Sequence, residues 1–206
     1  IDVARAGAAP AARAGTLVLA DGSRLTFRSL RMDAKTVTAA LSALGRRELP
    51  RTAVAAVAFR SDRVVPLSSL EPVKVLEYGF FDKVFAHRVD RAVSGGPLRM
   101  GGKTYARGLG LHSTCELQYD LDGRYRVFVA TAGIDDGVRP RGDATLTLAG
   151  DGKELVAPVR LRGQDAPNRL RVEVKGVKRL TVRVGFGEDG LDVADHVDLA
   201  DARLIR

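Results

Sequence analysis

The sequence predicts an all-β protein, in which a small β-barrel-like domain precedes a β-sandwich. Short runs of alternating apolar and polar residues recur at intervals of roughly 8–12 residues, which is typical of sandwiches and barrels. A length of 206 residues leaves room for two such domains. Asp-Gly pairs, which favour the tight turns of β-hairpins, separate several of these runs: Asp21-Gly22, Asp122-Gly123 and Asp151-Gly152.

The barrel-like domain is expected over residues 15–72. Residues 1–14 are rich in Ala, Gly and Arg without periodicity, so we expect them to be poorly ordered. Closely spaced strand-like runs follow, a pattern typical of small barrels of the Sm-like or SH3-like kind. A helix over residues 36–44 is an alternative, because Ala and Leu favour helices. The polar stretch 61–72 contains two prolines and is expected to hold the domain boundary.

Residues 73–206 are expected to form the sandwich. Residues 127–132 are apolar at nearly every position, as in a strand that is covered on both faces. Runs of clean alternation, which indicate strands with one buried face, follow at residues 144–148, 170–174 and 180–186. A last strand is predicted at residues 202–205.

The composition argues against several classes of function. The net charge is +8, but the basic residues are scattered singly, whereas nucleic-acid binding requires a concentrated patch. No nucleic-acid partner is therefore expected. No run of about 18 apolar residues occurs, so no membrane insertion is expected either. Cys115 is the single cysteine, which excludes an internal disulfide bond.

The stretch Gly133-Ile-Asp-Asp-Gly137 is the first candidate site. A buried strand here delivers two carboxylates, Asp135 and Asp136, to a loop flanked by glycines. Such an arrangement suits a cation site or a site that binds hydroxyl groups. The alternative is an acidic turn in which Asp135 accepts a hydrogen bond from its own backbone.

The stretch Gly108-Leu-Gly-Leu-His112 is the second candidate. Its glycines permit close backbone approach, and His112 would begin a strand as a hydroxyl donor or as the partner of a carboxylate. The alternative is a hydrogen-bonded structural histidine. A phosphate-binding loop is excluded, because no Lys-Ser or Lys-Thr follows a glycine at the required spacing.

The third candidate is the acidic segment 188–201, in which His196 is the only cation nearby. Calcium takes roughly six to eight oxygen ligands, so a structural Ca²⁺ would offset the repulsion between these acids. The predicted ligands are the carboxylates of Asp136, Asp192, Asp195 and Asp198. The alternative is a solvated acidic loop, in which Asp192 or Asp195 caps a short helical turn.

Catalytic patterns are missing from the sequence. It shows no Ser-His-Asp order, nucleophile elbow, zinc-ligand spacing or nucleotide-binding loop. The histidines at positions 87, 112 and 196 are far apart and have no cysteine nearby. We therefore do not expect this chain to be an enzyme.

Taken together, residues 105–112, 119–125, 133–136 and 195–204 resemble the NPCBM family. The resemblance spans residues 80–206 and implies a jelly-roll sandwich of the galactose-binding-domain-like type. Such domains occur beside glycoside hydrolases in exported bacterial proteins, several bind galactose-type sugars, and a structural calcium ion is common in this fold. One departure is Leu199, where the family usually has Trp, so the chain lacks its best aromatic platform for a sugar.

These observations predict a non-catalytic carbohydrate-binding module that binds galactose-type glycans. The predicted ligand-binding residues are Tyr105, Arg107, His112, Asp135 and His196. One alternative is a structural or protein-interaction module that kept the fold and lost the sugar site. Another is a binder of acidic polymers through an outward arginine stripe, which comprises Arg169, Arg171, Arg179 and Arg183.

The sequence also predicts the setting in which the module works. The chain starts at Ile1 and shows no signal peptide, so it is expected to be a piece of a longer protein. Its partners would be a glycan and the neighbouring domains of that parent protein. The expected location is secreted, periplasmic or on the cell surface, with the export signal outside this chain.

Overall fold

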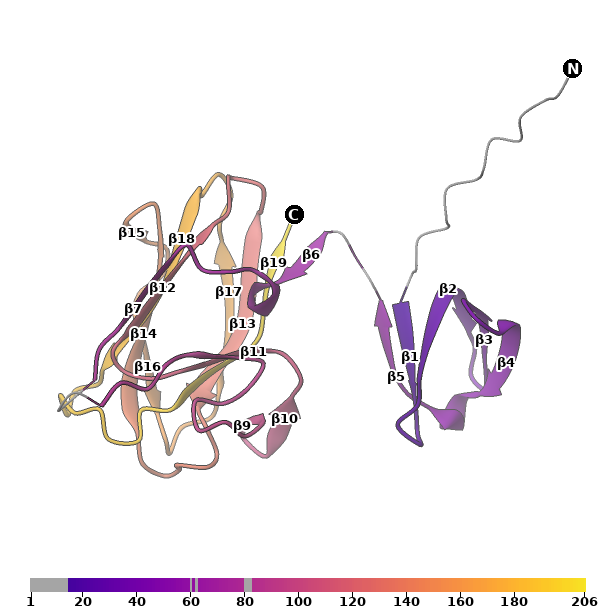
Figure 1. Ribbon diagram of the computed structural model, residues 1–206, viewed down its shortest axis with the longest axis horizontal. Helices are drawn as coiled ribbons and strands as arrows, with labels where there is room; N and C mark the ends of the chain where they lie inside the picture. The colour runs from indigo at the N-terminus through magenta and orange to yellow at the C-terminus, as the bar shows by residue number, and fades with distance from the viewer. Residues whose placement is uncertain (1–14, 60, 62, 80–82) are drawn as a thin grey trace, which may run out of the picture. The chain divides into compact units, whose positions relative to one another are not determined.

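A computed structural model describes residues 15–59, 61, 63–79 and 83–206, and the chain divides into two compact units, 1–62 and 63–206 (Figure 1). The division precedes the predicted domain start at residue 73, because strand β6 (Val64–Pro66) already pairs with the last strand of the sandwich. Residues 1–14 and the pair Phe80-Phe81 lie outside the described residues. Within the described chain, no helix has the length and hydropathy to cross a bilayer.

The N-terminal unit is an antiparallel sheet in the strand order β4-β3-β2-β1-β5. The segment predicted as either helix or strand forms β3, whose inward residues Val37, Ala39 and Leu41 alternate with half-buried ones, as the period of two requires. Its elements are β1 (Gly15–Leu19), β2 (Arg24–Met32), β3 (Thr36–Leu41), β4 (Gly45–Pro50), the 3-10 turn η1 (Arg51–Ala53) and β5 (Val54–Phe59).

The second unit stacks two antiparallel sheets face to face, which confirms the predicted all-β sandwich (Figure 1). The β13 sheet has the order β17-β13-β19-β11-β8, with β6 paired to β19. Its strands are β6, β8 (Arg88–Val89), β11 (Gly108–Leu111), β13 (Val127–Ile134), β17 (Asn168–Glu173) and β19 (Val197–Ile205).

The β18 sheet has the order β15-β14-β18-β12-β7, with β16 paired to β14. Its strands are β7 (Lys74–Glu77), β12 (Cys115–Asp120), β14 (Asp143–Gly150), β15 (Lys153–Glu154), β16 (Val159–Arg162) and β18 (Arg179–Phe186). A separate hairpin joins β9 (Leu98–Met100) to β10 (Lys103–Tyr105), and the 3-10 turn η2 (Leu67–Ser69) follows β6.

The sandwich core is built from the facing sides of the two sheets. Phe128 and Leu204 come from the β13 sheet, whereas Leu117 and Val182 come from the β18 sheet, and all four are almost completely buried. Leu199 is fully buried among them. The position at which the family usually has Trp therefore packs the interior of this chain rather than facing a ligand.

The glycines of β11 serve close packing. A Cβ at Gly110 would lie 2.4 Å from the carbonyl oxygen of Arg91 and 2.5 Å from the amide nitrogen of Val93, both of which are backbone atoms. Because both contacts are to backbone atoms, no side-chain rotamer change relieves them. Gly108-Leu-Gly is thus a packing motif, in agreement with the exclusion of a phosphate-binding loop.

Substitution of Gly110→Ala is expected to destabilise the sandwich by about 1–3 kcal/mol, because the added methyl group overpacks a rigid backbone contact. Urea unfolding of the variant measures this loss. Gly185→Ala is the matched control, since a Cβ at Gly185 on β18 meets no atom within 4 Å. Equal stabilities of the two variants would contradict the packing role of Gly110.

Candidate functional site

The register of three neighbouring strands brings distant parts of the sequence to one edge of the β13 sheet. Val197, the first residue of β19, pairs with Leu111 at the end of β11 and with Ile134 at the end of β13. His112, Asp135 and His196 are the residues directly beyond this row. We call these three residues the rim; the structure thus brings together three of the five predicted ligand-binding residues.

Aromatic rings pack against one another at the rim. The ring centroids of His112 and His196 lie 5.4 Å apart in an edge-on arrangement. Phe85 stacks on His112 with a centroid distance of 4.3 Å and lies 5.9 Å from His196. The Lys83 ammonium lies 4.8 Å from the Phe85 centroid. Sequence reasoning missed Phe85 as a site residue, because only the tertiary fold brings the segment between β7 and β8 to this edge.

Both rim histidines are shielded from water by burial. Burial lowers the pKa of His112, and the pKa of His196 falls through burial and through the neighbouring His112. The Nδ1 of His112 donates a hydrogen bond of 2.7 Å to the carbonyl oxygen of Ser113. In the neutral ring this leaves Nε2 as a hydrogen-bond acceptor.

Asp135 makes the turn that was the alternative interpretation of its motif. Its Oδ1 accepts the Gly137 amide at 2.8 Å, and its own amide donates to the carbonyl oxygen of His196 at 2.8 Å. Its Oδ2 is buried and has no hydrogen-bond partner among the described residues. The same holds for Oδ1 of Asp198, whose Oδ2 accepts the Arg99 amide at 2.8 Å.

Asp135 and Asp198 form a buried carboxyl pair. Burial, followed by the charge of Asp135, raises the pKa of Asp198 to about 8. Asp198 is then largely protonated at neutral pH, and its proton supplies the missing hydrogen bond to Asp135. A carboxyl group that is kept neutral in this way offsets the repulsion expected between two buried acids.

The four predicted calcium ligands do not form a common site. The oxygens of Asp136 accept the amides of Gly101 and Gly102 at 2.9 and 2.8 Å, which fastens the β9–β10 turn. Asp195 is fully buried and accepts the Ser113 hydroxyl at 2.6 Å and the Asp143 amide at 2.9 Å.

Asp198 belongs to the carboxyl pair, and Asp192 interacts electrostatically with His112. Among the described residues, no group of three or more His, Cys, Asp or Glu side chains is placed to hold a metal ion. A structural Ca²⁺ therefore stays a prediction from the sequence, and these four carboxylates do not fit it.

The remaining two predicted ligand-binding residues lie elsewhere. Tyr105 is 9% exposed and packs in a cluster with Leu98 and Met100, and Lys103 lies over its ring at 4.4 Å from the centroid. It therefore offers little open ring face to a sugar. Arg107 is exposed just before β11, and its carbonyl oxygen accepts the amide of Asp201.

The proposed arginine stripe is not continuous, and this prediction was wrong. Arg169 and Arg171 lie on β17 of the β13 sheet, whereas Arg179 and Arg183 lie on β18 of the other sheet. The last two are also neutralised locally. Arg179 pairs with Asp120 at 2.9 Å, and Arg183 pairs with Glu116 at 2.6 Å.

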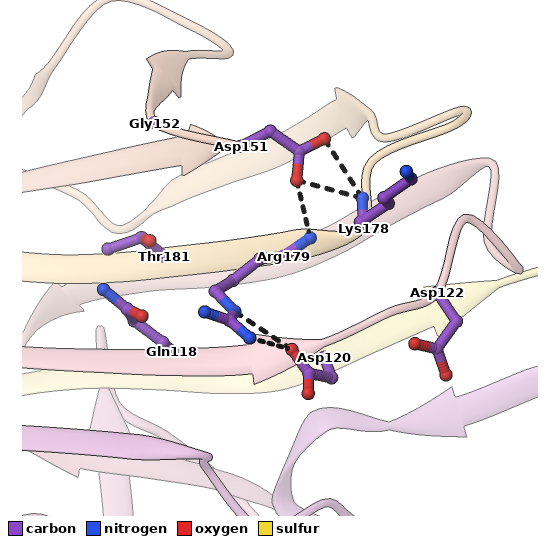
Figure 2. A pocket seen from close by; sticks show the side chains of 8 residues that line it. All are labelled: Gln118, Asp120, Asp122, Asp151, Gly152, Lys178, Arg179 and Thr181. Atoms are coloured by element: carbon purple, nitrogen blue, oxygen red, sulfur yellow. Dashed lines mark hydrogen bonds and ion pairs between the residues drawn. The ribbon is translucent and has the colours of Figure 1, made fainter.

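A polar groove of about 560 Å³ lies at the end of the β18 sheet where β12 ends and β18 begins (Figure 2). Its charged groups largely satisfy one another. Asp151 accepts the backbone amides of Lys178 and Arg179, and Arg179 bonds Asp120. Since β12 begins beside the rim and ends here, this groove is at the opposite end of the sandwich.

The comparison with protein families identifies the sandwich. The model of the NPCBM/NEW2 domain matches residues 63–205. The chain belongs to the NPCBM/NEW2 family. Domains of this family are non-catalytic carbohydrate-binding modules, which agrees with the prediction that the chain is not an enzyme.

Curated relatives of this NPCBM domain are much longer proteins. A Renibacterium salmoninarum protein that bears the name of an endo-alpha-N-acetylgalactosaminidase is 33% identical over 92 residues, which are 45% of this chain and 6% of the relative. Alpha-1,3-galactosidase B of Akkermansia muciniphila is 29% identical over 118 residues, covering 55% of this chain and 15% of the relative. The chain thus spans a small part of either relative.

Solved structures share the fold of the NPCBM domain. The CBM51 module of Clostridium perfringens GH95, solved with methyl-galactose, has a TM-score of 0.61 at 23% identity over 68% of this chain and 99% of that one. The CBM51-2 and INT domains of Clostridium perfringens ZmpB, solved with GlcNAc, have a TM-score of 0.63 at 24% identity over 94% of this chain and 38% of theirs.

Asp198→Asn is expected to flatten the pH dependence of stability. Folding raises the pKa of Asp198 from 3.8 to about 8, so folding takes up a proton, and the associated stability is lost as pH rises through about 8. The asparagine amide keeps both hydrogen bonds without titrating. Melting temperatures from about pH 6 to about pH 9 should fall less for the variant than for the parent.

The exposed Asp122→Asn is the control for this experiment, because Asp122 lies in a surface ion pair with Arg124. It should leave the parent's pH profile unchanged. If Asp198→Asn melts with the same slope as the parent, Asp198 does not carry the buried proton.

Proposed function

We propose that the NPCBM domain binds a galactose-type glycan at the rim. The observation that carries this proposal is the convergence of His112, Asp135 and His196 beyond a single row of paired residues. Support comes from the relatives, whose names include a galactosidase and CBM51 modules solved with methyl-galactose and GlcNAc. Family membership by itself leaves the place of binding open.

The rim chemistry suits a ligand with several hydroxyl groups. His112 is almost fully buried and offers only its Nε2 acceptor, whereas the partly exposed His196 ring can donate or accept. Charged groups of both signs lie nearby. Asp192 and Lys83 influence the pKa of His112 in opposite directions, and Arg141 influences that of His196. A hydroxyl group both donates and accepts, so such a mixed surface recognises sugars better than ions of one sign.

The packing of Phe85 at the rim predicts weak affinity for a sugar. Phe85 stacks on His112 through its ring and carries the Lys83 ammonium at 4.8 Å, so little of its ring is open for stacking on a sugar. Binding would then depend on hydrogen bonds, whose net contribution after desolvation is about 1 kcal/mol each. Dissociation constants near 1 mM, about 4 kcal/mol of binding free energy, are expected.

We also infer that this domain works outside the cell within a larger, exported protein. The larger protein is supported by the length of the relatives, of which the chain matches only 6% and 15%. A place outside the cell is supported by the glycosidase names of those relatives, since enzymes of that kind act on extracellular glycans. In such a protein, even a weak sugar site raises the local concentration of a linked catalytic domain at its substrate.

His196→Ala is expected to weaken binding of methyl-galactose at least tenfold, because it removes a half-exposed imidazole at the centre of the rim. Titration followed by NMR suits millimolar affinities, and GlcNAc serves as the second sugar. Arg171→Ala is the control, since Arg171 is exposed on β17 and pairs across the sheet with Val129, in the middle of β13. It should bind like the parent.

Two results would contradict the proposal. If neither sugar shifts a resonance of the parent chain at tens of millimolar, the domain does not bind galactose-type sugars. Equal losses in His196→Ala and Arg171→Ala would show that the rim is not the binding site.

A further inference from the structure

One face of the N-terminal unit collects arginines that are scattered in the sequence. On β2, Leu25, Phe27 and Leu30 point into the small core. A bulge between Phe27 and Ser29 inserts one extra residue, so Arg28 and Ser29 both lie on the outward side. Three arginines of β2 are therefore outward and exposed: Arg24, Arg28 and Arg31.

The neighbouring strands extend this face with a fourth arginine and small polar residues. Thr38 of β3 pairs with Arg31 on one side and with Glu48 of β4 on the other. One step along, Ala40 pairs with Ser29 and with Arg46. Strands lie about 4.8 Å apart and residues about 3.3 Å along a strand, so Arg46 is within about 12 Å of Arg28 and Arg31. We call Arg24, Arg28, Arg31 and Arg46 the arginine face.

The charge of this face is not neutralised by ion pairs. Among the described residues, every ion pair lies in the sandwich, where arginines such as Arg124, Arg160 and Arg183 each contact a carboxylate. Residues 15–59 hold seven Lys or Arg and three Asp or Glu, a surplus of four in 45 residues. Residues 63–206 hold 23 and 20, a surplus of only three in 144 residues.

The three acids of the N-terminal unit leave the arginine face positive. Asp21 accepts the Ser23 amide, and Asp33 accepts the amides of Lys35 and Thr36, so both are engaged in turns. Asp33 interacts electrostatically with Arg31 at the end of the strand. Glu48 is the acid that lies on the face itself, against four arginines.

We propose that the arginine face binds an acidic polysaccharide. Guanidinium groups form paired hydrogen bonds with carboxylate and sulfate oxygens, and they keep their charge at all physiological pH values. The threonine and serine hydroxyls between them, on Thr26, Ser29, Thr38 and Ser42, match sugar hydroxyls. This surface belongs to a different unit from the rim and is independent of the function proposed for the rim.

The side chains on this face favour a polysaccharide over single-stranded nucleic acid. Proteins that bind single strands stack bases on aromatic side chains interleaved with basic ones. The outward positions of β2, β3 and β4 hold Arg, Thr, Ser, Ala and Glu, and Phe27 points into the core. Duplex DNA could be bound through its phosphates without aromatic side chains, so experiment has to distinguish it from a polysaccharide.

The test uses the full chain and heparin oligosaccharides as the probe, with binding measured by calorimetry at several salt concentrations. The triple variant Arg28→Gln, Arg31→Gln, Arg46→Gln should bind heparin at least tenfold more weakly, with a shallower salt dependence. The matched control removes the same charge from ion-paired sandwich positions: Arg124→Gln, Arg162→Gln and Arg183→Gln. The control should lose less than twofold.

Replacement of Arg28, Arg31 and Arg46 by Lys keeps the charge but loses the paired hydrogen bonds, so its affinity should lie between those of the parent and the glutamine variant. Unchanged melting temperatures would show that the glutamine variant is folded. Equal losses in the glutamine variant and the sandwich control would overturn the proposal, since net charge alone would then explain binding. Duplex DNA binding more tightly than heparin through the same arginines would overturn it in favour of nucleic acid. These heparin results do not depend on whether methyl-galactose binds at the rim, so the two proposals can fail separately.

Discussion

The pairing of Val197 with Leu111 and Ile134 is the constraint on which the candidate sugar site depends. Antiparallel strands make β11 and β13 leave the sheet at the edge where β19 enters it. Three segments that are far apart in the sequence therefore reach one place. A slip of one residue in β19 would turn its buried side chains outward, and burial of Val197 and Leu199 prevents that slip.

Hydrogen bonds to buried and partly buried carboxylates hold the loops at this edge. Asp195 connects the residue after His112 to the start of β14, and Asp198 and Asp136 hold the β9–β10 hairpin through backbone amides. Backbone amides and the proton shared by Asp135 and Asp198 stabilise these acids. Two acids of the segment 188–201, Asp195 and Asp198, therefore hold neighbouring loops in place, each at its own position.

The two units differ in how their charged side chains are paired. In the sandwich, cross-strand neighbours such as Glu116 and Arg183 neutralise each other, so the basic surplus of the sequence leaves little local field. In the N-terminal unit, alternation and one bulge at Arg28 gather unpaired arginines on a single face. A rim that suits sugar hydroxyl groups and a cationic face would together suit a protein that attaches to complex, partly acidic glycans.

The sequence alone determined the all-β class, the sandwich and its family, because alternation, Asp-Gly turns and linear motifs are local. It also singled out His112, Asp135 and His196, which the fold brings to one edge because each follows or precedes a strand. Tertiary structure decided the rest. The burial of Leu199 and Tyr105, the place of Phe85, and the separation of Arg169 from Arg183 depend on which strands pair. Pairing is a long-range property, so no local pattern encodes which side chains meet.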